Sequence, residues 1–143
     1  MTKWSLYQKV EFEMIKSAEE FVTLRESEIE EEYHQAAHDE APMDVWLDVI
    51  DRYPDMKEWV AHNKTVPLKI LEILSEDIDD DVRYSVAEKR KLSFDLFEKL
   101  SEDACESVRM RIACNAKSPA YILKKLLNDK SSRIVEHVRG RLA

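Results

Sequence analysis

The sequence has almost no glycine. Gly140 is the single glycine among 143 residues, where average usage would supply about ten. A loop that cradles phosphates, a dinucleotide-binding fingerprint and the sharp turn that presents a catalytic serine all depend on glycines, so these sites are excluded. Tight β-hairpins also lose their usual turn residue. The scarcity of glycine therefore favours a helical protein.

Cysteines and long apolar runs are scarce as well. The two cysteines, Cys105 and Cys114, have a spacing of about 13 Å along one helix, which is too far for a disulfide. We expect two buried, reduced thiols. The sequence shows neither a signal peptide nor the run of about 18 apolar residues that would span a membrane. These absences predict a cytoplasmic protein without a membrane partner.

Positive charge is scarce in the first part of the chain. The net charge is −8, and residues 1–66 hold 7 Lys and Arg against 16 Asp and Glu, a net −9. Residues 67–100 carry −3, whereas residues 101–143 carry +4, from 9 basic and 5 acidic residues. The acidic part suits a basic protein partner, and the basic part leaves nucleic acid as an alternative.

What the sequence does contain is an internal repeat, which appears when it is compared with itself at an offset of 26 residues. The segment 74–93 aligns with 100–119, and that segment aligns with 126–143. Such a period is the signature of a repeat architecture. The aligned columns are Leu74, Leu100 and Leu126; Asp77, Asp103 and Asp129; Val82, Val108 and Ile134; Val86, Ile112 and Val138; and Ala61, Ala87 and Ala113.

Each repeat is expected to form two short helices. The first helix has apolar residues at helical spacing, as in Leu68, Leu71 and either Ile73 or Leu74. Pro67, Ser93 and Pro119 fall where this helix begins, and Asp79–Asp81 or Glu106–Ser107 begin the second. One such hairpin cannot bury its own apolar stripe, so neighbouring hairpins must stack. Residues 42–66 fit the pattern with a two-residue deletion between the helices.

The repeats resemble HEAT-like repeats, and their Val-Arg-x-x-Val-Ala core is similar to the leucine-rich repeat variant. The resemblance covers residues 42–143 and implies an all-α fold: a short right-handed α-solenoid of about four helical hairpins, residues 42–66, 67–92, 93–118 and 119–143, in one structural domain. It implies scaffolding or binding rather than one defined activity. The last repeat departs from the pattern at Val135 and Arg139. The residues that carry the resemblance are Asp77, Val82, Arg83, Val86, Ala87, Asp103, Val108, Arg109, Ile112 and Ala113.

Residues 1–41 do not follow the repeat and are expected to form a helical cap of two helices. Trp4, Leu6, Tyr7, Val10, Phe12 and Met14 indicate one helix, and Phe21, Leu24, Ile29 and Tyr33 indicate a longer one with the acidic run ESEIEEE on its outside. An open solenoid needs capped ends. Trp46 and Trp59 lie within apolar stripes and are expected in the core.

Basic and aromatic residues recur once per repeat. Arg83 and Arg109, preceded by Lys57, could line the concave face, with Tyr84 and Trp59 as stacking surfaces for bases. The structural alternative is an aspartate–arginine ladder, because Asp77 and Asp103 precede these arginines by six residues. We favour the ladder, since ion pairing neutralises the cations that a phosphate would need.

Two other groups have a functional and a structural interpretation. His34 and His38 lie one helical turn apart and could hold zinc, but Gln35 occupies the position of a general base and no cysteine is near, so we favour a solvated face without a metal. The glutamates Glu28, Glu30, Glu31 and Glu32 form either a solvated face or a decoy for a basic partner.

No catalytic group is assembled by sequence, and no cofactor is implied. Ser75 and Ser101 have no histidine close in sequence. The leading hypothesis is a non-enzymatic protein-interaction module, possible in the concrete form of an immunity-type inhibitor that neutralises a basic nuclease toxin. The alternatives are nucleic-acid binding through the basic C-terminal repeats and a purely structural scaffold. The candidate partner-binding residues are Lys57, Trp59, Arg83, Tyr84, Arg109, Arg111, Glu28, Glu30, Glu31 and Glu32.

Overall fold

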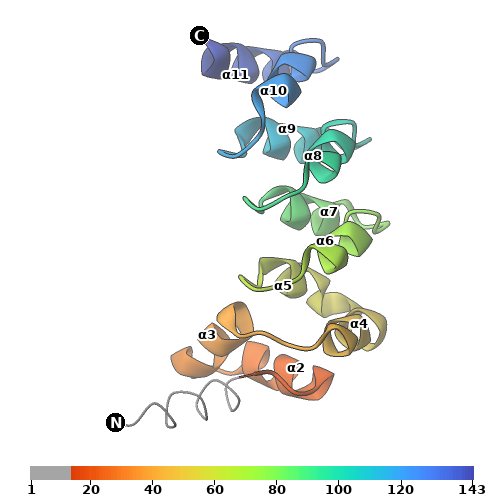
Figure 1. Ribbon diagram of the computed structural model, residues 1–143, viewed down its shortest axis with the longest axis vertical. Helices are drawn as coiled ribbons and strands as arrows, with labels where there is room; N and C mark the ends of the chain where they lie inside the picture. Colours follow the sequence, from red (N-terminus) through yellow and green to blue (C-terminus); the bar gives the residue numbers. More distant parts are fainter. Residues whose placement is uncertain (1–13) are drawn as a thin grey trace. The chain divides into compact units, whose positions relative to one another are not determined.

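The computed structural model describes residues 14–143, and every structural statement below concerns that range. Within it, all regular secondary structure is helical and no strand is present, so the all-α prediction is confirmed (Figure 1). The chain divides into two compact units, Met1–Ile70 and Leu71–Ala143, and each is described by itself. The single structural domain and the repeat boundaries expected from the sequence stay predictions.

The first unit is built from four α-helices and one turn of 3₁₀-helix. Helix α2 packs against both α3 and α4, and α4 packs against α5. Its core centres on two aromatic rings: Phe21 and Trp46 are fully buried and meet edge to face, with ring centroids 5.3 Å apart. The elements are α2 (Ala18–Glu26), α3 (Glu30–His38), α4 (Met43–Arg52), η1 (Pro54–Met56) and α5 (Lys57–His62).

The longer helix predicted across Phe21–Tyr33 is wrong, because the structure has α2 and α3 there instead. Ser27 has extended backbone angles, φ −67° and ψ 144°, and its hydroxyl accepts a hydrogen bond of 3.0 Å from the Ile29 N–H. This local bond competes with helix continuation. The glutamate run therefore begins a new helix, where negative charge is favoured. The other predicted helix, through Trp4 and Phe12, lies outside the described residues.

One of the two tryptophans expected in the core is not buried. Trp46 is fully enclosed, but Trp59 on α5 is 40% exposed. Its ring is covered on one face by the Arg25 guanidinium, whose carbon lies 3.4 Å from the ring centroid, and His62 meets it edge to face. An indole can be partly shielded by a cation that itself stays hydrated, so Trp59 needs no place in the core.

The second unit is built from helices arranged in two rows. Helix α9 packs against α7 and α11, α8 packs against α10, and each of the pairs α8–α9 and α10–α11 forms a hairpin (Figure 1). Helix α6 (Leu68–Leu74) crosses the boundary between the units. The remaining elements are α7 (Asp80–Ala87), α8 (Phe94–Ser101), α9 (Glu106–Cys114), α10 (Ala120–Leu126) and α11 (Ser132–Leu142).

The columns that the sequence aligns at 26 residues are buried, as predicted. Leu74 and Leu100 are 0% exposed and Leu126 is 2% exposed. Ile73 is 39% exposed, so Leu74 is the residue of that pair that faces the core. Burial of a leucine side chain stabilises the fold by about 1.5–3 kcal/mol. The other buried columns are Val82, Val108 and Ile134; and Val86, Ile112 and Val138.

The helix starts also follow the sequence. Ser93 caps α8, its hydroxyl accepting a hydrogen bond of 3.2 Å from the Leu96 N–H, and Pro119 is the N-cap residue of α10. The cysteines differ from expectation. Both are free but only half-buried, because Cys105 is the N-cap residue of α9 rather than part of a continuous helix and Cys114 ends it.

Two buried asparagines tie loops to neighbouring helices. The Asn115 side-chain amide donates to the carbonyls of Ala87 and Lys89 at 2.9 and 2.8 Å, and its Oδ1 accepts from the Lys117 N–H at 2.9 Å. In the first unit, Asn63 makes the corresponding set of bonds, donating to the carbonyls of Ala36 and Asp39. Sequence reasoning missed both residues, since the positions between and after them in the 26-residue register hold Lys89 and Arg141.

Candidate functional site

The recurring arginines of the second unit form ion pairs. Arg109 Nε donates to Asp129 Oδ2 at 2.9 Å, and its terminal NH1 donates to the main-chain carbonyl of Asp103 at 2.8 Å. Arg83 repeats this geometry, with Asp103 Oδ2 at 2.8 Å and the Asp77 carbonyl at 2.8 Å. Each arginine thus binds the carbonyl of the aspartate six residues before it and the carboxylate of the aspartate twenty residues after it.

These ion pairs are largely withdrawn from solvent. The Arg109 and Asp129 side chains are 6% and 7% exposed, and those of Arg83 and Asp103 are 16% and 8% exposed. Burial tends to raise the pKa of Asp103, but hydrogen bonds from Arg83 and from the Cys105 N–H outweigh it, so this pKa lies below its usual value. Both guanidinium groups are therefore neutralised and held in place.

A second set of ion pairs is more exposed. Lys99 Nζ lies 2.6 Å from Glu76 Oε1 and 3.2 Å from the Ser75 hydroxyl. Lys125 Nζ, one 26-residue step along, lies 2.7 Å from Glu98 Oε1 and also contacts Glu102. Burial lowers the pKa of Lys125, but hydrogen bonds to these two glutamates raise it further, so the net shift is upward. Exposed pairs of this kind contribute little stability each.

Tyr84 and Arg111 meet at a hollow on the row formed by α7, α9 and α11. The hollow has a volume of about 210 Å³ and is also lined by Arg133 from α11. Within the described residues, neither Arg111 nor Arg133 forms an ion pair or a side-chain hydrogen bond. The structure thus brings two of the predicted residues together and adds Arg133. Its remaining lining residues are Glu106, Ser107, Met110 and Cys114.

The four glutamates of the acidic run lie at the start of α3 and just before it. Glu28, Glu30 and Glu31 are exposed and Glu32 is half-buried. In the part of the chain that the structure describes, none of the four carboxylates pairs with a basic side chain. The acidic run is therefore open to solvent, with its charge available to a partner.

The two histidines of α3 stack on each other. The ring centroids of His34 and His38 are 3.9 Å apart with an interplanar angle of 18°, and His38 Nδ1 hydrogen-bonds with the His34 carbonyl at 3.0 Å. Among residues 14–143, no third histidine, cysteine or carboxylate joins them to complete a metal site. The stacked pair is explained by packing on a solvated face.

Lys57 and Trp59 belong to the first unit. Lys57 begins α5 and is half-buried, and Trp59 stands on the same helix beneath Arg25. The ring face that contacts Arg25 is already occupied by a cation. Trp59 therefore offers at most one ring face to another molecule.

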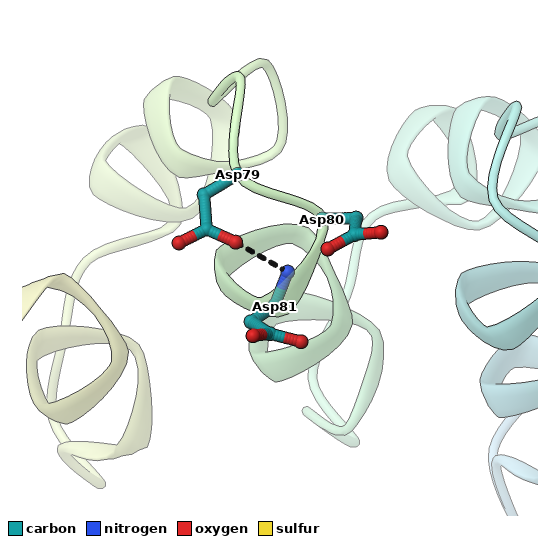
Figure 2. A group of neighbouring side chains, drawn as sticks. All are labelled: Asp79, Asp80 and Asp81. Carbon is teal, nitrogen blue, oxygen red and sulfur yellow. Dashed lines mark hydrogen bonds between the residues drawn. The ribbon is translucent and has the colours of Figure 1, made fainter.

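Three consecutive aspartates form the one acidic group of ligand-like spacing found among the described residues (Figure 2). The carboxylates of Asp79, Asp80 and Asp81 each place an oxygen within 4.8 Å of the others, and all three residues are exposed. Asp79 Oδ1 accepts a hydrogen bond of 2.9 Å from the Asp81 N–H and so caps α7. Helix capping and the favourable effect of negative charge at a helix start explain this group.

Comparison with protein-family models, with curated proteins and with solved structures finds no match to this chain. None of the helices in residues 14–143 combines the length and the apolar character that a bilayer crossing requires. The function must therefore be argued from the geometry itself. That geometry offers two exposed charged features, the glutamates of α3 and the arginine-lined hollow between α9 and α11, and it holds Arg83 and Arg109 in internal ion pairs.

Proposed function

We propose that this chain is a non-enzymatic protein-interaction module, built as a short right-handed α-solenoid of HEAT-like hairpins with an N-terminal helical cap. The periodic contacts support this architecture. The Arg83–Asp103 and Arg109–Asp129 ion pairs recur at 26 residues, as do the buried leucines. Stacked hairpins share a continuous core and leave one row of helices for binding.

The observation that carries the proposal is the different fate of the charged residues. The once-per-repeat arginines are consumed by internal ion pairs, whereas the glutamates of α3 have no basic partner within the described residues. Exposed like charges close together repel one another and gain by binding an opposite charge. The partner of this face is therefore a basic protein.

A concrete form of this function is an immunity-type inhibitor that binds a basic nuclease toxin in the cytoplasm. Acidic charge speeds association with a basic partner and excludes acidic competitors. The net charge of −9 over residues 1–66 supports that role. Inhibition then requires only that the active site of the toxin be covered, so the chain itself needs no catalytic group.

The test is native capture with matched charge variants. The intact protein, a variant with Glu28, Glu30, Glu31 and Glu32 changed to Gln, and a control variant that loses the same number of charges elsewhere are each purified from the source cell with bound proteins. The control replaces Asp44, Asp55 and Asp95 by Asn and Glu136 by Gln; all four are exposed and, within the described residues, have no side-chain partner.

We expect a basic protein in equimolar amount with the intact chain and with the control, and its loss from the glutamine variant. A partner that binds all three proteins equally would contradict the role of α3. The absence of any equimolar partner would contradict the interaction module. For the inhibitor, the captured protein should cleave nucleic acid alone and stop doing so when one equivalent of the chain is added.

The alternative is binding of nucleic acid by the second unit, which rests on Arg111 and Arg133 beside Tyr84. Two unpaired guanidinium groups and an aromatic ring are the elements of a single-strand site. A gel-shift experiment at low salt tests it. Affinity should then fall steeply with salt, and Arg111→Gln should reduce the salt slope by about one; no complex at low salt removes this alternative.

A further inference from the structure

We propose that the hollow between α9 and α11 is a second binding site, which takes a carboxylate side chain from an acidic segment of a protein. Its walls come from two neighbouring helices, with Arg111 on α9, Arg133 on α11 and Tyr84 of α7 at its edge. This site has the opposite polarity to the glutamates of α3. It therefore goes beyond the function proposed above, which concerns a basic partner.

The charge of the hollow is the first argument. Arg111 and Arg133 line the same hollow, and within the described residues no carboxylate neutralises either of them. This contrasts with Arg83 and Arg109 of the same unit, which both have aspartate partners. Two guanidinium groups kept near each other without an anion create a local positive potential, and a carboxylate between them relieves it with charge-assisted hydrogen bonds.

The one acidic residue in the wall does not cancel this charge. Glu106 Oε1 accepts a hydrogen bond of 2.6 Å from the Ser131 hydroxyl, and it forms no ion pair with either arginine. The lining therefore holds two positive groups and one negative group, a net charge of +1. That balance suits a single carboxylate better than a row of phosphates.

The size of the hollow is the second argument. Its volume of about 210 Å³ is smaller than the roughly 300–1,000 Å³ of pockets that enclose cofactors or drug-sized ligands. The occupant that fits is a side chain, presented by a chain that runs across the helices. Met110 and Cys114 add an apolar wall, against which the methylene groups of a glutamate or a neighbouring apolar side chain can pack.

The acidic surroundings favour a protein segment over nucleic acid. Asp80 and Asp81 at the start of α7 and Glu136 on α11 are exposed on the helices that border the hollow. The repeated phosphates of a nucleic acid strand would meet these carboxylates on either side of the arginines, with like-charge repulsion at each. A peptide that carries one or two carboxylates next to apolar residues avoids that repulsion.

The experiment uses the full-length protein and NMR spectra that include the arginine Nε–Hε signals. The probe is the blocked peptide acetyl-Glu-Phe-Glu-amide, and its matched control is acetyl-Gln-Phe-Gln-amide. We expect the acidic peptide to shift the signals of Arg111 and Arg133 and the ring of Tyr84, and the neutral peptide to leave them unchanged. Equal shifts with both peptides, or none with the acidic one, would overturn the proposal.

Variants then separate this site from general attraction to a positive surface. Arg111→Gln and Arg133→Gln should each weaken the acidic peptide by about three- to tenfold, the loss expected for one charge-assisted contact at an exposed site. Arg90→Gln is the control, because Arg90 is exposed, lies outside the hollow and, within the described residues, has no partner. Equal weakening by all three variants would contradict a defined site.

A single-stranded oligonucleotide and inorganic phosphate serve as competing probes. Binding of either through Arg111 and Arg133 at a lower concentration than the acidic peptide would overturn the assignment in favour of that ligand. Because the experiment relies on synthetic probes and on α9 and α11, its outcome is independent of the capture through α3. Failure here leaves the interaction module standing, and failure of that capture leaves this site to be judged by its own titration.

Discussion

At the scale of the single residue, the arginine ion pairs differ in burial although their geometry is the same. Arg109 and Asp129 are 6% and 7% exposed as side chains, whereas Arg83 is 16% exposed. Removing one member of a buried pair leaves the other charge without compensation, and this costs more than the pair itself contributes. The more buried arginine is therefore the more sensitive position, even though both occupy the same column of the repeat.

We predict that Arg109→Met lowers the free energy of unfolding by about 3–5 kcal/mol, because it leaves the Asp129 carboxylate and the Asp103 carbonyl without their donor. Arg83→Met should cost less, since water reaches that pair more easily. Urea denaturation followed by circular dichroism measures both. Arg90→Met is the matched control and should change stability by less than about 0.5 kcal/mol; a cost for Arg109 as small as that of the control would show that its ion pair is not structural.

The lowered pKa of Asp103 predicts a specific response to acid. Folding lowers this pKa from the ordinary value of 3.8, so the native state binds a proton less readily than the unfolded chain does. The stabilisation is fully present above the unfolded pKa and is lost as pH falls through the lower folded pKa. The free energy of unfolding should therefore decline below about pH 4, the region where an unperturbed aspartate titrates.

Carboxyl NMR of the native protein should show Asp103 titrating below 3.8. Asp103→Asn should be less stable at neutral pH and should lose part of the decline in stability on acidification. An Asp103 signal that titrates at or above 3.8 would contradict the ion pair with Arg83 as the determinant of its charge.

At the scale of the secondary-structure element, buried asparagine side chains hold the ends of neighbouring helices together. Asn115 is 1% exposed and follows α9, yet it donates to the carbonyls of Ala87 and Lys89 after α7. Those carbonyls stand at a helix end, where no further turn supplies an N–H. In the first unit, Asn63 does the same for Ala36 and Asp39. The bonds bind successive elements without adding apolar surface.

We predict that Asn115→Ala lowers the free energy of unfolding by about 1–3 kcal/mol, the usual cost of leaving buried polar groups unsatisfied. The control is Asn128→Ala, since Asn128 is exposed in the turn before α11 and its side chain has no partner within the described residues. Thermal and urea unfolding of both variants checks this. Equal small effects would mean that water replaces the amide of Asn115 freely.

Much of the element structure was predictable from the sequence, because periodic apolar residues report burial directly. Leu74, Leu100 and Leu126 were aligned by their spacing and are buried. The division between α2 and α3 was missed because Phe21 and Tyr33 kept a helical spacing across it. Ser27 followed by glutamates was the available signal, since serine before acidic residues is typical of a helix start.

The candidate site was less predictable than the fold, because side-chain partners depend on the stacking of hairpins. Spacing alone linked Arg109 to Asp103, six residues before it, and the structure shows that this bond reaches the carbonyl while the carboxylate partner is Asp129. Tyr84 and Arg111 were expected at a binding surface, but no pattern in one sequence shows that Arg133 lines the same hollow.

At the scale of the whole molecule, the distribution of charge separates the two hypotheses. A protein of net charge −8 repels a polyanion at long range, and the +4 of residues 101–143 is the part that could overcome this. Of the basic residues in the second unit, Arg83, Arg109, Lys99 and Lys125 are in internal ion pairs. Paired cations release no counterions from DNA unless their pairs break.

We therefore predict that the chain forms no stable complex with a 20-base-pair duplex, a length of about two helical turns, at about 0.15 M salt, where the Debye length is about 8 Å. Fluorescence anisotropy over a range of salt concentrations measures this. Any weak complex at low salt should depend on Arg111 and Arg133 and be unaffected by Arg83→Gln, because the guanidinium of Arg83 is held by Asp103. A steep salt slope that Arg83→Gln reduces by about one would mean that the ion pairs open to receive phosphates, and the protein-interaction module would then give way to a nucleic-acid-binding one.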